Sequence, residues 1–410
     1  MKIFKLMAIA LVAMLGFSAC DKDCDHDFIE HDFTQDIVGT WTYMESEQCE
    51  AMVINPDGSF EITGVMRGGS LYEEKGTIKV VNNKVTLAFD GDKDTFKGRL
   101  EFVAGKSLSL VMFDDNATRL TYDYCKEDLS DEVVGMWVCT EEVFGQGESV
   151  AIATYNEDGT SYFTGFSPEV NGFAKQEEFN YKVVGNLIIS SLNVGANSPT
   201  LYFPIKFDIV PNGTELGDIM TTYDLTNGTN ATFLRVKQNL NLTTGKVYYY
   251  KSAYVTNAKG KDEDFTILEH PFNMTNIKGG NFDEMFGADL FSVELNANSI
   301  KLISRPYGQD VEIVIPITVE GNKITLDLSA ESPAFRNVEM YMFQDANDSQ
   351  LHMYMPTRSF INHFSNMEIF SLLVEGKIDK NDAAAFEKVY AELEARVESI
   401  NVSFVLKARK

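Results

Sequence analysis

Short apolar runs separated by small polar turns make up most of the chain. Residues 53–64 (VINPDGSFEITG) and 154–165 (TYNEDGTSYFTG) each place Asn, Asp and Gly between two extended runs. These residue types tolerate positive φ and are typical of hairpin turns between strands. Through residue 240, no long window shows the 3.6-residue period of an amphipathic helix. The pattern therefore predicts a meander of short antiparallel strands.

This strand pattern occurs three times in the same order. The segment IVGTW at residues 37–41 recurs as VVGMW at 133–137, and VVNNKVTLAF at 80–89 is answered by VVGNLIISSL at 183–192. The second of these elements appears again as VEGNKITLDL at 319–328. We interpret the chain as three tandem copies of one unit, the third enlarged. A strand meander must hide its edges, and closure into a barrel is the simplest way to do so.

The enlargement of the third copy is predicted to be helical. Residues 357–374 follow Pro356 and carry apolar side chains near helical spacing. A second helix is predicted to begin at Asp379 or Asn381 as its N-cap. Residues 400–408 (INVSFVLKA) return to a strand pattern. The two helices are therefore expected before the last strand of the third copy.

One strand of the third copy is apolar on both faces. Residues 338–343 (VEMYMF) place methionines on one face and Tyr341 and Phe343 on the other. A strand that is buried on both faces needs cover outside the barrel. We predict that the two helices pack on the outer wall beside this strand.

The first 19 residues are predicted to be an export signal. Lys2 and Lys5 precede an apolar run at residues 6–17, and small residues close it. The run is too short to span a bilayer, which needs about 20 apolar residues. Residues 17–20 (FSAC) resemble the lipobox of bacterial lipoproteins, in which the signal is cut before the cysteine. The resemblance implies that Cys20 carries the lipid, and a plain secretory cut after residue 19 is the alternative.

Residues 20–35 are expected to form a solvated acidic tether, because they have little apolar surface to bury. The acidic residues that follow Cys20 resemble the export signals of surface lipoproteins in some gut Gram-negative bacteria. That resemblance implies a lipid-anchored outer-membrane protein exposed at the cell surface, and a periplasm-facing position is the alternative. The tether also holds four residues with metal-ligating side chains, Asp25, His26, Glu30 and His31. A charged run of this kind is usually only solvated, so no metal site is predicted.

Composition narrows the range of partners. The formal net charge is −26, which argues against binding to nucleic acid and against an electrostatic grip on anionic lipid. The protein is therefore expected to contact the membrane only through its N-terminal lipid. Four cysteines remain besides the lipidated one: Cys24, Cys49, Cys125 and Cys139. They show no CxxC spacing, so neither a zinc site nor a redox site is indicated, and their disulfide pairing stays open.

The repeated Gly-x-Trp motifs at residues 39–41 and 135–137 resemble the signature of the lipocalins. In that family the tryptophan closes the narrow end of an up-and-down barrel, and an arginine from the last strand stacks on it. The resemblance implies two barrel-closing pairs, Trp41 with Arg119 and Trp137 with Arg235. The third copy has no tryptophan, and Tyr248 is its nearest aromatic residue. Copy spacings of 96 and 110 residues are short for the family's eight-stranded barrel, so the barrels are either small and filled or built from fewer strands.

The predicted fold is all-β, with three tandem antiparallel lipocalin-like β-barrels and a two-helix insertion before the last strand of the third. The predicted organisation is a signal peptide at residues 1–19, a tether at 20–35, and barrels at 36–128, 129–240 and 241–410. The protein is expected to have no enzymatic activity and to bind no cofactor. The five histidines are scattered without metal-binding spacing, and none completes a nucleophilic motif.

The function expected from these features is binding of a small apolar or amphipathic ligand in the third barrel. Methionine adapts to irregular apolar ligands, and tyrosine supplies an orienting hydroxyl. The candidate pocket residues are Tyr248, Tyr250, Met340, Met342, Met353 and Met355. Ordinary core packing is the competing interpretation of these six side chains. The alternative function is a non-catalytic structural or interaction module whose barrel loops meet a protein or glycan partner.

Overall fold

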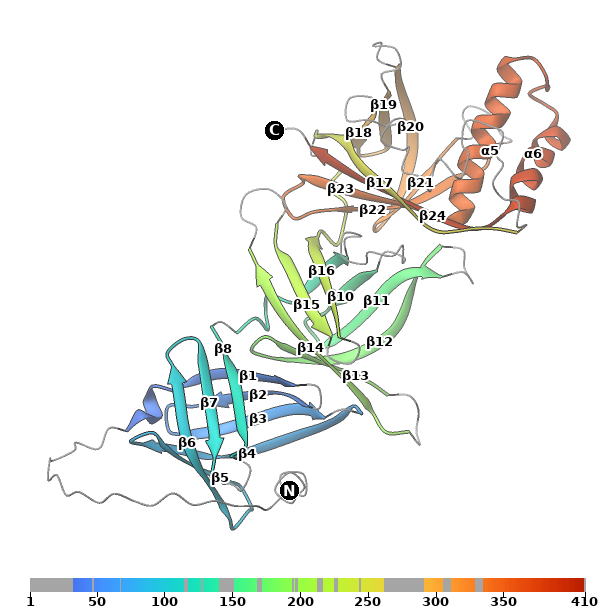
Figure 1. Cartoon of the computed structure of the whole chain (residues 1–410). Coiled ribbons are helices and arrows are strands. Elements are labelled where there is room, and N and C mark those ends of the chain that lie inside the picture. Colours follow the sequence, from blue (N-terminus) through green and yellow to red (C-terminus); the bar gives the residue numbers. More distant parts are fainter. Residues whose placement is uncertain are drawn as a thin grey trace, which may run out of the picture. The chain divides into compact units, whose positions relative to one another are not determined.

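The computed structural model describes most of the chain from residue 32 onward (Figure 1). The described residues are 32–45, 48–66, 68–113, 117–126, 128–139, 151–167, 172–193, 195, 198–211, 217–224, 228–242, 245–261, 291–304, 311–328 and 335–408. The predicted signal peptide, the predicted lipid-attachment residue Cys20 and the four residues of the tether with metal-ligating side chains lie outside them.

The first copy forms a closed eight-stranded barrel. Each strand pairs antiparallel with the next, and β1 also pairs with β8 to close the ring. A 3-10 turn, η1 (Phe33–Gln35), precedes the barrel, and its Thr34 Oγ1 accepts a hydrogen bond of 3.1 Å from the Val80 amide. Part of the predicted tether is thus docked on the barrel. The strands are β1 Gly39–Glu45, β2 Gln48–Ile54, β3 Ser59–Met66, β4 Ser70–Val81, β5 Lys84–Phe89, β6 Thr95–Val103, β7 Ser107–Met112 and β8 Arg119–Cys125.

The second copy forms another closed eight-stranded barrel, in which β9 pairs with both β10 and β16. Its strands are β9 Gly135–Cys139, β10 Ile152–Tyr155, β11 Thr160–Ser167, β12 Gly172–Val184, β13 Leu187–Leu192, β14 Leu201–Val210, β15 Ile219–Asp224 and β16 Thr229–Val236. The Asn-Glu-Asp-Gly turn predicted from the sequence joins β10 to β11, and Asp158 accepts hydrogen bonds from the amide and hydroxyl of Thr160.

The third copy is also a closed eight-stranded barrel, with β17 and β24 closing it. Its strands are β17 Val247–Gly260, β18 Phe291–Asn296, β19 Ser299–Ser304, β20 Val311–Glu320, β21 Lys323–Leu326, β22 Val338–Gln344, β23 Gln350–Met355 and β24 Val397–Ala408. Two helices, α5 (Thr357–Val374) and α6 (Ala383–Arg396), lie between β23 and β24. Among the described residues, no helix has the length and apolarity needed to cross a membrane.

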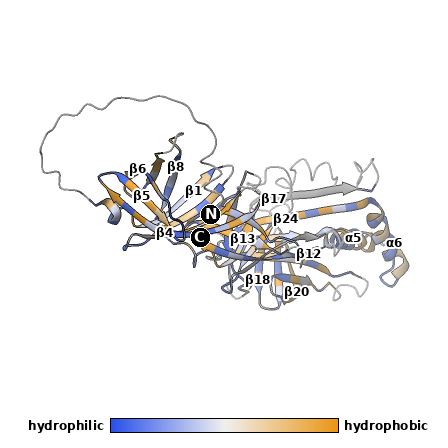
Figure 2. Cartoon of the chain, turned by 90° about the horizontal axis from the view of Figure 1, so that it is seen from below, coloured by the Kyte–Doolittle hydropathy of each residue, from blue (hydrophilic) through white to orange (hydrophobic). Residues whose placement is uncertain are grey.

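These barrels confirm the predicted fold class, including the position of the two helices. The suggestion of fewer strands is wrong, because each barrel has eight. Short strands and tight turns make eight strands possible within the short copies, and Asn82 and Asn83 turn the chain between β4 and β5 with φ of 48° and 62°. Apolar and polar residues alternate along strands such as β24 (Figure 2), which is how one face reaches the barrel core.

The packing of the helices against the third barrel differs in part from the prediction. Phe360 and Ile361, in the first turns of α5, join the hydrophobic core inside the third barrel. The outward-facing Tyr341 and Phe343 of β22 pack instead in a separate cluster that includes Val138. Helix α5 lies beside the start of β22, since Asn362 Nδ2 donates a 2.9 Å hydrogen bond to the Asn337 carbonyl. The outer face at Tyr341 and Phe343 is covered by the other cluster, so the predicted cover by the helices is corrected for this face. Asp382 caps α6, since its carboxylate accepts a 3.0 Å hydrogen bond from the Ala385 amide.

Candidate functional site

The floor of the second barrel is built from the Gly-x-Trp motif and the last strand. Arg235 lies directly opposite Trp137 in the register of β16 with β9, and its guanidinium carbon sits 4.3 Å from the centre of the indole ring. The Arg235 Nη1 atom donates a 2.7 Å hydrogen bond to the Val134 carbonyl. Gly135 has a φ of +135°, and a β-carbon there would lie 3.1 Å from this guanidinium. Glycine thus leaves room for the stacked arginine.

The floor of the first barrel uses a different residue. Tyr124, not Arg119, lies opposite Trp41 in the register of β8 with β1. The Tyr124 and Trp41 rings are 4.9 Å apart, and Trp41 Nε1 donates a 2.8 Å hydrogen bond to the Ile37 carbonyl. Arg119 is five residues away along β8, about 16 Å at the usual strand rise. Its exposed side chain pairs with Glu101, so the predicted Trp41–Arg119 pair is corrected.

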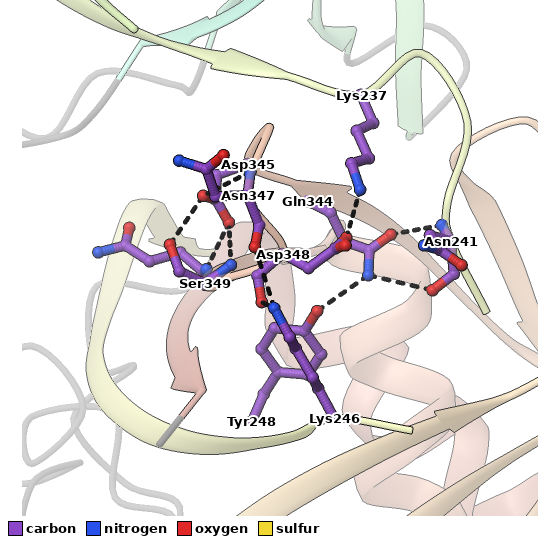
Figure 3. A network of polar contacts seen from close by, with 10 residues as sticks. Lys237, Asn241, Lys246, Tyr248, Gln344, Asp345, Asn347, Asp348 and Ser349 are labelled. Carbon is purple, nitrogen blue, oxygen red and sulfur yellow. Dashed lines mark hydrogen bonds and ion pairs between the residues drawn. The ribbon is translucent and has the colours of Figure 1, made fainter. Parts of the chain in front are cut away.

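The floor of the third barrel is polar where the other two are closed by tryptophan. Tyr248 is fully buried, and Gln344 Nε2 lies 3.0 Å from its hydroxyl (Figure 3). The Gln344 side chain also pairs with both backbone groups of Asn241, in the segment that enters β17. Beside it, Asp345 accepts hydrogen bonds from the amides of Ser349 and Gln350 and fixes the turn between β22 and β23. In each barrel, a side chain of the floor thus donates a hydrogen bond to a backbone carbonyl of the segment that enters the barrel.

All six candidate pocket residues of the third barrel lie in its hydrophobic core. Each is at most 9% exposed, and all belong to one cluster of buried side chains. The inward-facing methionines of β22 and β23 pack against the end of α5 through Phe360. The structure therefore brings the six together, as packed core residues.

The first barrel contains a buried acid that the sequence reading missed. Glu50, on β2, is 1% exposed. Its Oε1 atom accepts a hydrogen bond from the Tyr122 hydroxyl, and its Oε2 atom accepts hydrogen bonds from the Tyr72 hydroxyl and from Gln48 Nε2, the last at 2.6 Å. Gly64 faces Glu50 from β3, and a β-carbon there would lie 2.4 Å from the Tyr72 ring. A glycine at this position makes the space that the phenol occupies.

The phenols around Glu50 remain protonated donors. Burial raises the pKa of the Tyr72 and Tyr122 hydroxyls far above the ordinary value, and the negative charge of Glu50 raises it further. Burial also raises the pKa of Tyr43, whose ring lies 5.5 Å from that of Tyr122. We call Glu50, Gln48, Tyr72 and Tyr122 the Glu50 cluster.

A small apolar cavity of about 10 Å³ adjoins the Glu50 cluster at Tyr122. This volume is close to the space that one water molecule needs. Its wall is otherwise apolar and comes from five of the eight strands: Met52, Phe60, Ile62, Leu87, Phe89, Leu110, Met112 and Leu120. Polar groups at one end and apolar walls at the other make this interior amphipathic.

Cysteine and metal chemistry find no support in the described part of the chain. Cys49, Cys125 and Cys139 are buried thiols that form no disulfide, and Cys24 lies outside the described residues. Burial raises the pKa of the Cys49 and Cys139 thiols to about 12. The described residues contain no group of three or more His, Cys, Asp and Glu side chains placed to hold a metal ion.

Comparison with known proteins does not assign the chain to a family. No protein-family model matches it, and no curated protein matches it. Among solved structures, the crystal structure of the isotype 1 transferrin binding protein B of serogroup B Neisseria meningitidis aligns with 8% sequence identity and a TM-score of 0.14. The alignment covers 75% of this chain and 62% of that protein. The chain thus spans less than two thirds of its length, and a TM-score this low defines no functional relationship.

Proposed function

We propose that this protein is a non-catalytic, lipid-anchored cell-surface protein whose filled barrels meet a protein or glycan partner through their outer surfaces. The observation that carries the proposal is the packing of the third barrel. Its six candidate pocket residues are buried against one another and against α5. Space for a drug-sized ligand would need about 300 Å³ or more.

The first barrel supports the same proposal. Its cavity of about 10 Å³ is far smaller than such a ligand. Apolar side chains are instead exposed on the outside of α5, where Met367, Phe370 and Val374 are 46%, 56% and 71% exposed. Clustered exposed apolar residues are typical of interaction surfaces.

Binding of a small apolar ligand inside the third barrel is the competing proposal. It rests on the methionines of β22 and β23, because methionine side chains rearrange easily. Any such ligand would have to displace packed core atoms, and the cost of that displacement would lower its affinity.

Native mass spectrometry separates the two proposals. The full chain is expressed in a Gram-negative host that processes lipoproteins, extracted in detergent and stripped of detergent in the instrument. We expect one species, the processed chain with its covalent lipid at Cys20. A second, non-covalent small molecule retained in stoichiometric amount would contradict the filled-barrel proposal.

Surface exposure is tested separately, by trypsin treatment of intact cells. The barrels should be cleaved or released in intact cells, whereas a periplasmic control protein stays protected. Protection of this chain until the outer membrane is broken would place it on the periplasmic side.

A further inference from the structure

The outer wall of the first barrel concentrates positive charge on one side, although the whole chain has a formal net charge of −26. Strand residues alternate between inward and outward positions, and the core cluster identifies the inward ones, such as Ile78 of β4, Val85 of β5 and Leu100 of β6. The basic residues of these strands and of β8 therefore take outward positions. Five exposed ones on neighbouring strands form what we call the basic face: Lys79, Lys84, Lys97, Arg99 and Arg119.

Strand register brings these five side chains together. Lys84 of β5 lies directly opposite Arg99 of β6, and one residue of β7 separates Arg99 from Arg119 of β8. Lys79 of β4 and Lys97 of β6 lie on either side of a single residue of β5. Neighbouring strands are about 4.8 Å apart, so the row from Lys84 to Arg119 is about 14 Å long. The five charges thus share one patch of the wall.

The charge of the basic face is only partly compensated. Glu101 pairs with both arginines, which leaves a net charge of +4 on this face. Lys79, Lys84 and Lys97 form no ion pair with another residue that the structure describes. Like charges directly opposite each other on neighbouring strands are destabilising. The placement of Lys84 opposite Arg99 therefore costs stability, and an anionic partner would offset that cost.

An exposed aromatic ring lies on the same face. Phe113, directly after β7, is 65% exposed, and its amide donates a 2.9 Å hydrogen bond to the Lys97 carbonyl. Met112 before it belongs to the core cluster, so alternation directs Phe113 outward. Basic residues beside exposed aromatic rings are typical of surfaces that meet lipid headgroups, where the ring enters the interface and the cations contact phosphates.

The chain enters the first barrel beside the basic face. Asp32 forms a β-bridge with Val81, and Val81 lies opposite Lys84. Asp32 follows Cys20, the lipid-attachment residue of the proposed function, by twelve residues. A chain of this length spans at most about 40 Å. The membrane that would hold the lipid is thus within reach of the basic face.

The net charge of the whole chain does not decide how this face behaves. At an ionic strength of about 0.1 M, charges are screened beyond about 10 Å. Acids elsewhere on the chain therefore oppose the contact of this face with lipid only weakly. Each basic residue close to an anionic membrane surface strengthens binding about fivefold, which corresponds to about 1 kcal/mol.

We propose that the basic face of the first barrel docks on the anionic lipid headgroups of the membrane that anchors the chain. Lys79, Lys84 and Lys97 contact phosphates, and Phe113 enters the interface. This inference rests on the lipid anchor of the proposed function. It leaves the second and third barrels for the protein or glycan partner.

Lysine acetylation, measured by peptide mass spectrometry, tests the docking. The lipidated full chain is added to preformed vesicles of phosphatidylcholine, either alone or mixed equally with phosphatidylglycerol, and treated with an uncharged acetylating ester. We expect Lys84 and Lys97 to react at least about threefold more slowly on the anionic vesicles. The exposed Lys380 and Lys388 of the third barrel are internal controls and should change by less than about 1.5-fold. In 1 M salt the screening length falls to about 3 Å, and the difference should vanish.

Arginine variants locate the contact without altering the lysines that report it. The double variant Arg99→Gln, Arg119→Gln removes two charges, so the slowing on anionic vesicles should fall below about 1.5-fold. The conservative double variant Arg99→Lys, Arg119→Lys keeps the charge and should keep the slowing. The matched control is Arg358→Gln with Arg396→Gln, which removes the same charge from exposed positions of α5 and α6 and should leave the slowing unchanged.

Four results would overturn the inference. Equal acetylation of Lys84 and Lys97 on both kinds of vesicle, in a membrane-bound chain, would refute the docking but keep the lipid anchor. Slow acetylation on both kinds, relieved when the acids of residues 21–31 become amides, would show that the tether covers the face. Slowing by the acidic polysaccharide alginate, but not by anionic vesicles, would assign the face to a glycan. A chain that carries no lipid and stays in solution would refute the anchor, and this inference with it.

Discussion

Replacing Arg235 by alanine should destabilise the second barrel, whereas replacing Arg119 should leave the first barrel nearly unchanged. Arg235 stacks on the buried Trp137 and bonds the Val134 carbonyl at 2.7 Å. Arg119 is 53% exposed and pairs with Glu101, which is itself 39% exposed. The two arginines occupy similar places in the sequence repeat, so they form a matched pair.

The magnitude follows from the contacts that each arginine makes. A cation–π contact of a partly exposed arginine contributes about 1 kcal/mol, and a charged hydrogen bond about 2 kcal/mol. Arg235→Ala should therefore lower the free energy of unfolding by about 3 kcal/mol. An exposed ion pair contributes about 0.5 kcal/mol or less, which is the expected effect of Arg119→Ala.

Urea unfolding followed by tryptophan fluorescence measures both effects. The chain has two tryptophans, and Trp41→Phe leaves Trp137 as the reporter for the second barrel. With a slope of about 1.5 kcal/mol per molar urea, Arg235→Ala should lower the midpoint by about 2 M. An unchanged midpoint in Arg235→Ala, or an equal loss in Arg119→Ala reported by Trp41, would refute the reasoning.

Three further predictions concern pH, thiol reactivity and the exposed surface. Burial lowers the pKa of both His352 and His363 to about 4, so the unfolded chain binds extra protons between pH 6.5 and 4. Each histidine should lower the free energy of unfolding by about 3 kcal/mol as pH drops through that window, and His352→Phe should reduce the loss measured in urea titrations by about half. Iodoacetamide at pH 8 should leave Cys49 and Cys139 unlabelled until urea is added, because their buried thiols stay protonated. Peptide mass spectrometry measures the labelling, and labelling of the native protein would contradict the burial of these thiols. Phe370→Ser should change the thermal midpoint very little, since the ring is 56% exposed, and a large drop would show that α5 packs through it.

The architecture could be predicted from the sequence because its signals are local. Hairpin turns such as Asn55 to Gly58 and Asn156 to Gly159 are set by residues that adopt them readily, and both form as expected. The strand pattern repeated at residues 319–328 predicts the third barrel, although this copy lacks the Gly-x-Trp motif. The α6 cap was misplaced by one to three residues, because Asp379, Asn381 and Asp382 are all good capping residues and only one can be used.

The pairing of strands could not be predicted from motifs. Arg119 and Arg235 both lie on the last strand of a barrel, but register decides which side chain meets the tryptophan. In the first barrel that side chain is Tyr124, and in the third barrel Gln344 and Tyr248 do the closing. A motif search for arginine cannot find these substitutes.

The Glu50 cluster was missed for a related reason. Residues 48–54 are buried on both faces, so the sequence of β2 does not show which side faces inward. The donors Tyr72 and Tyr122 are 22 and 72 residues away along the chain. A lone glutamate within an apolar strand was the one local signal of a buried acid.

Hydrogen–deuterium exchange of the native full chain tests the central claim, that three copies close separately into three barrels. The closing pairs are β1 with β8, β9 with β16 and β17 with β24. The account predicts slow exchange in peptides from both strands of all three pairs. Fast exchange in β8, β16 or β24, with slow exchange in the neighbouring strand of the same sheet, would show an open edge and contradict it.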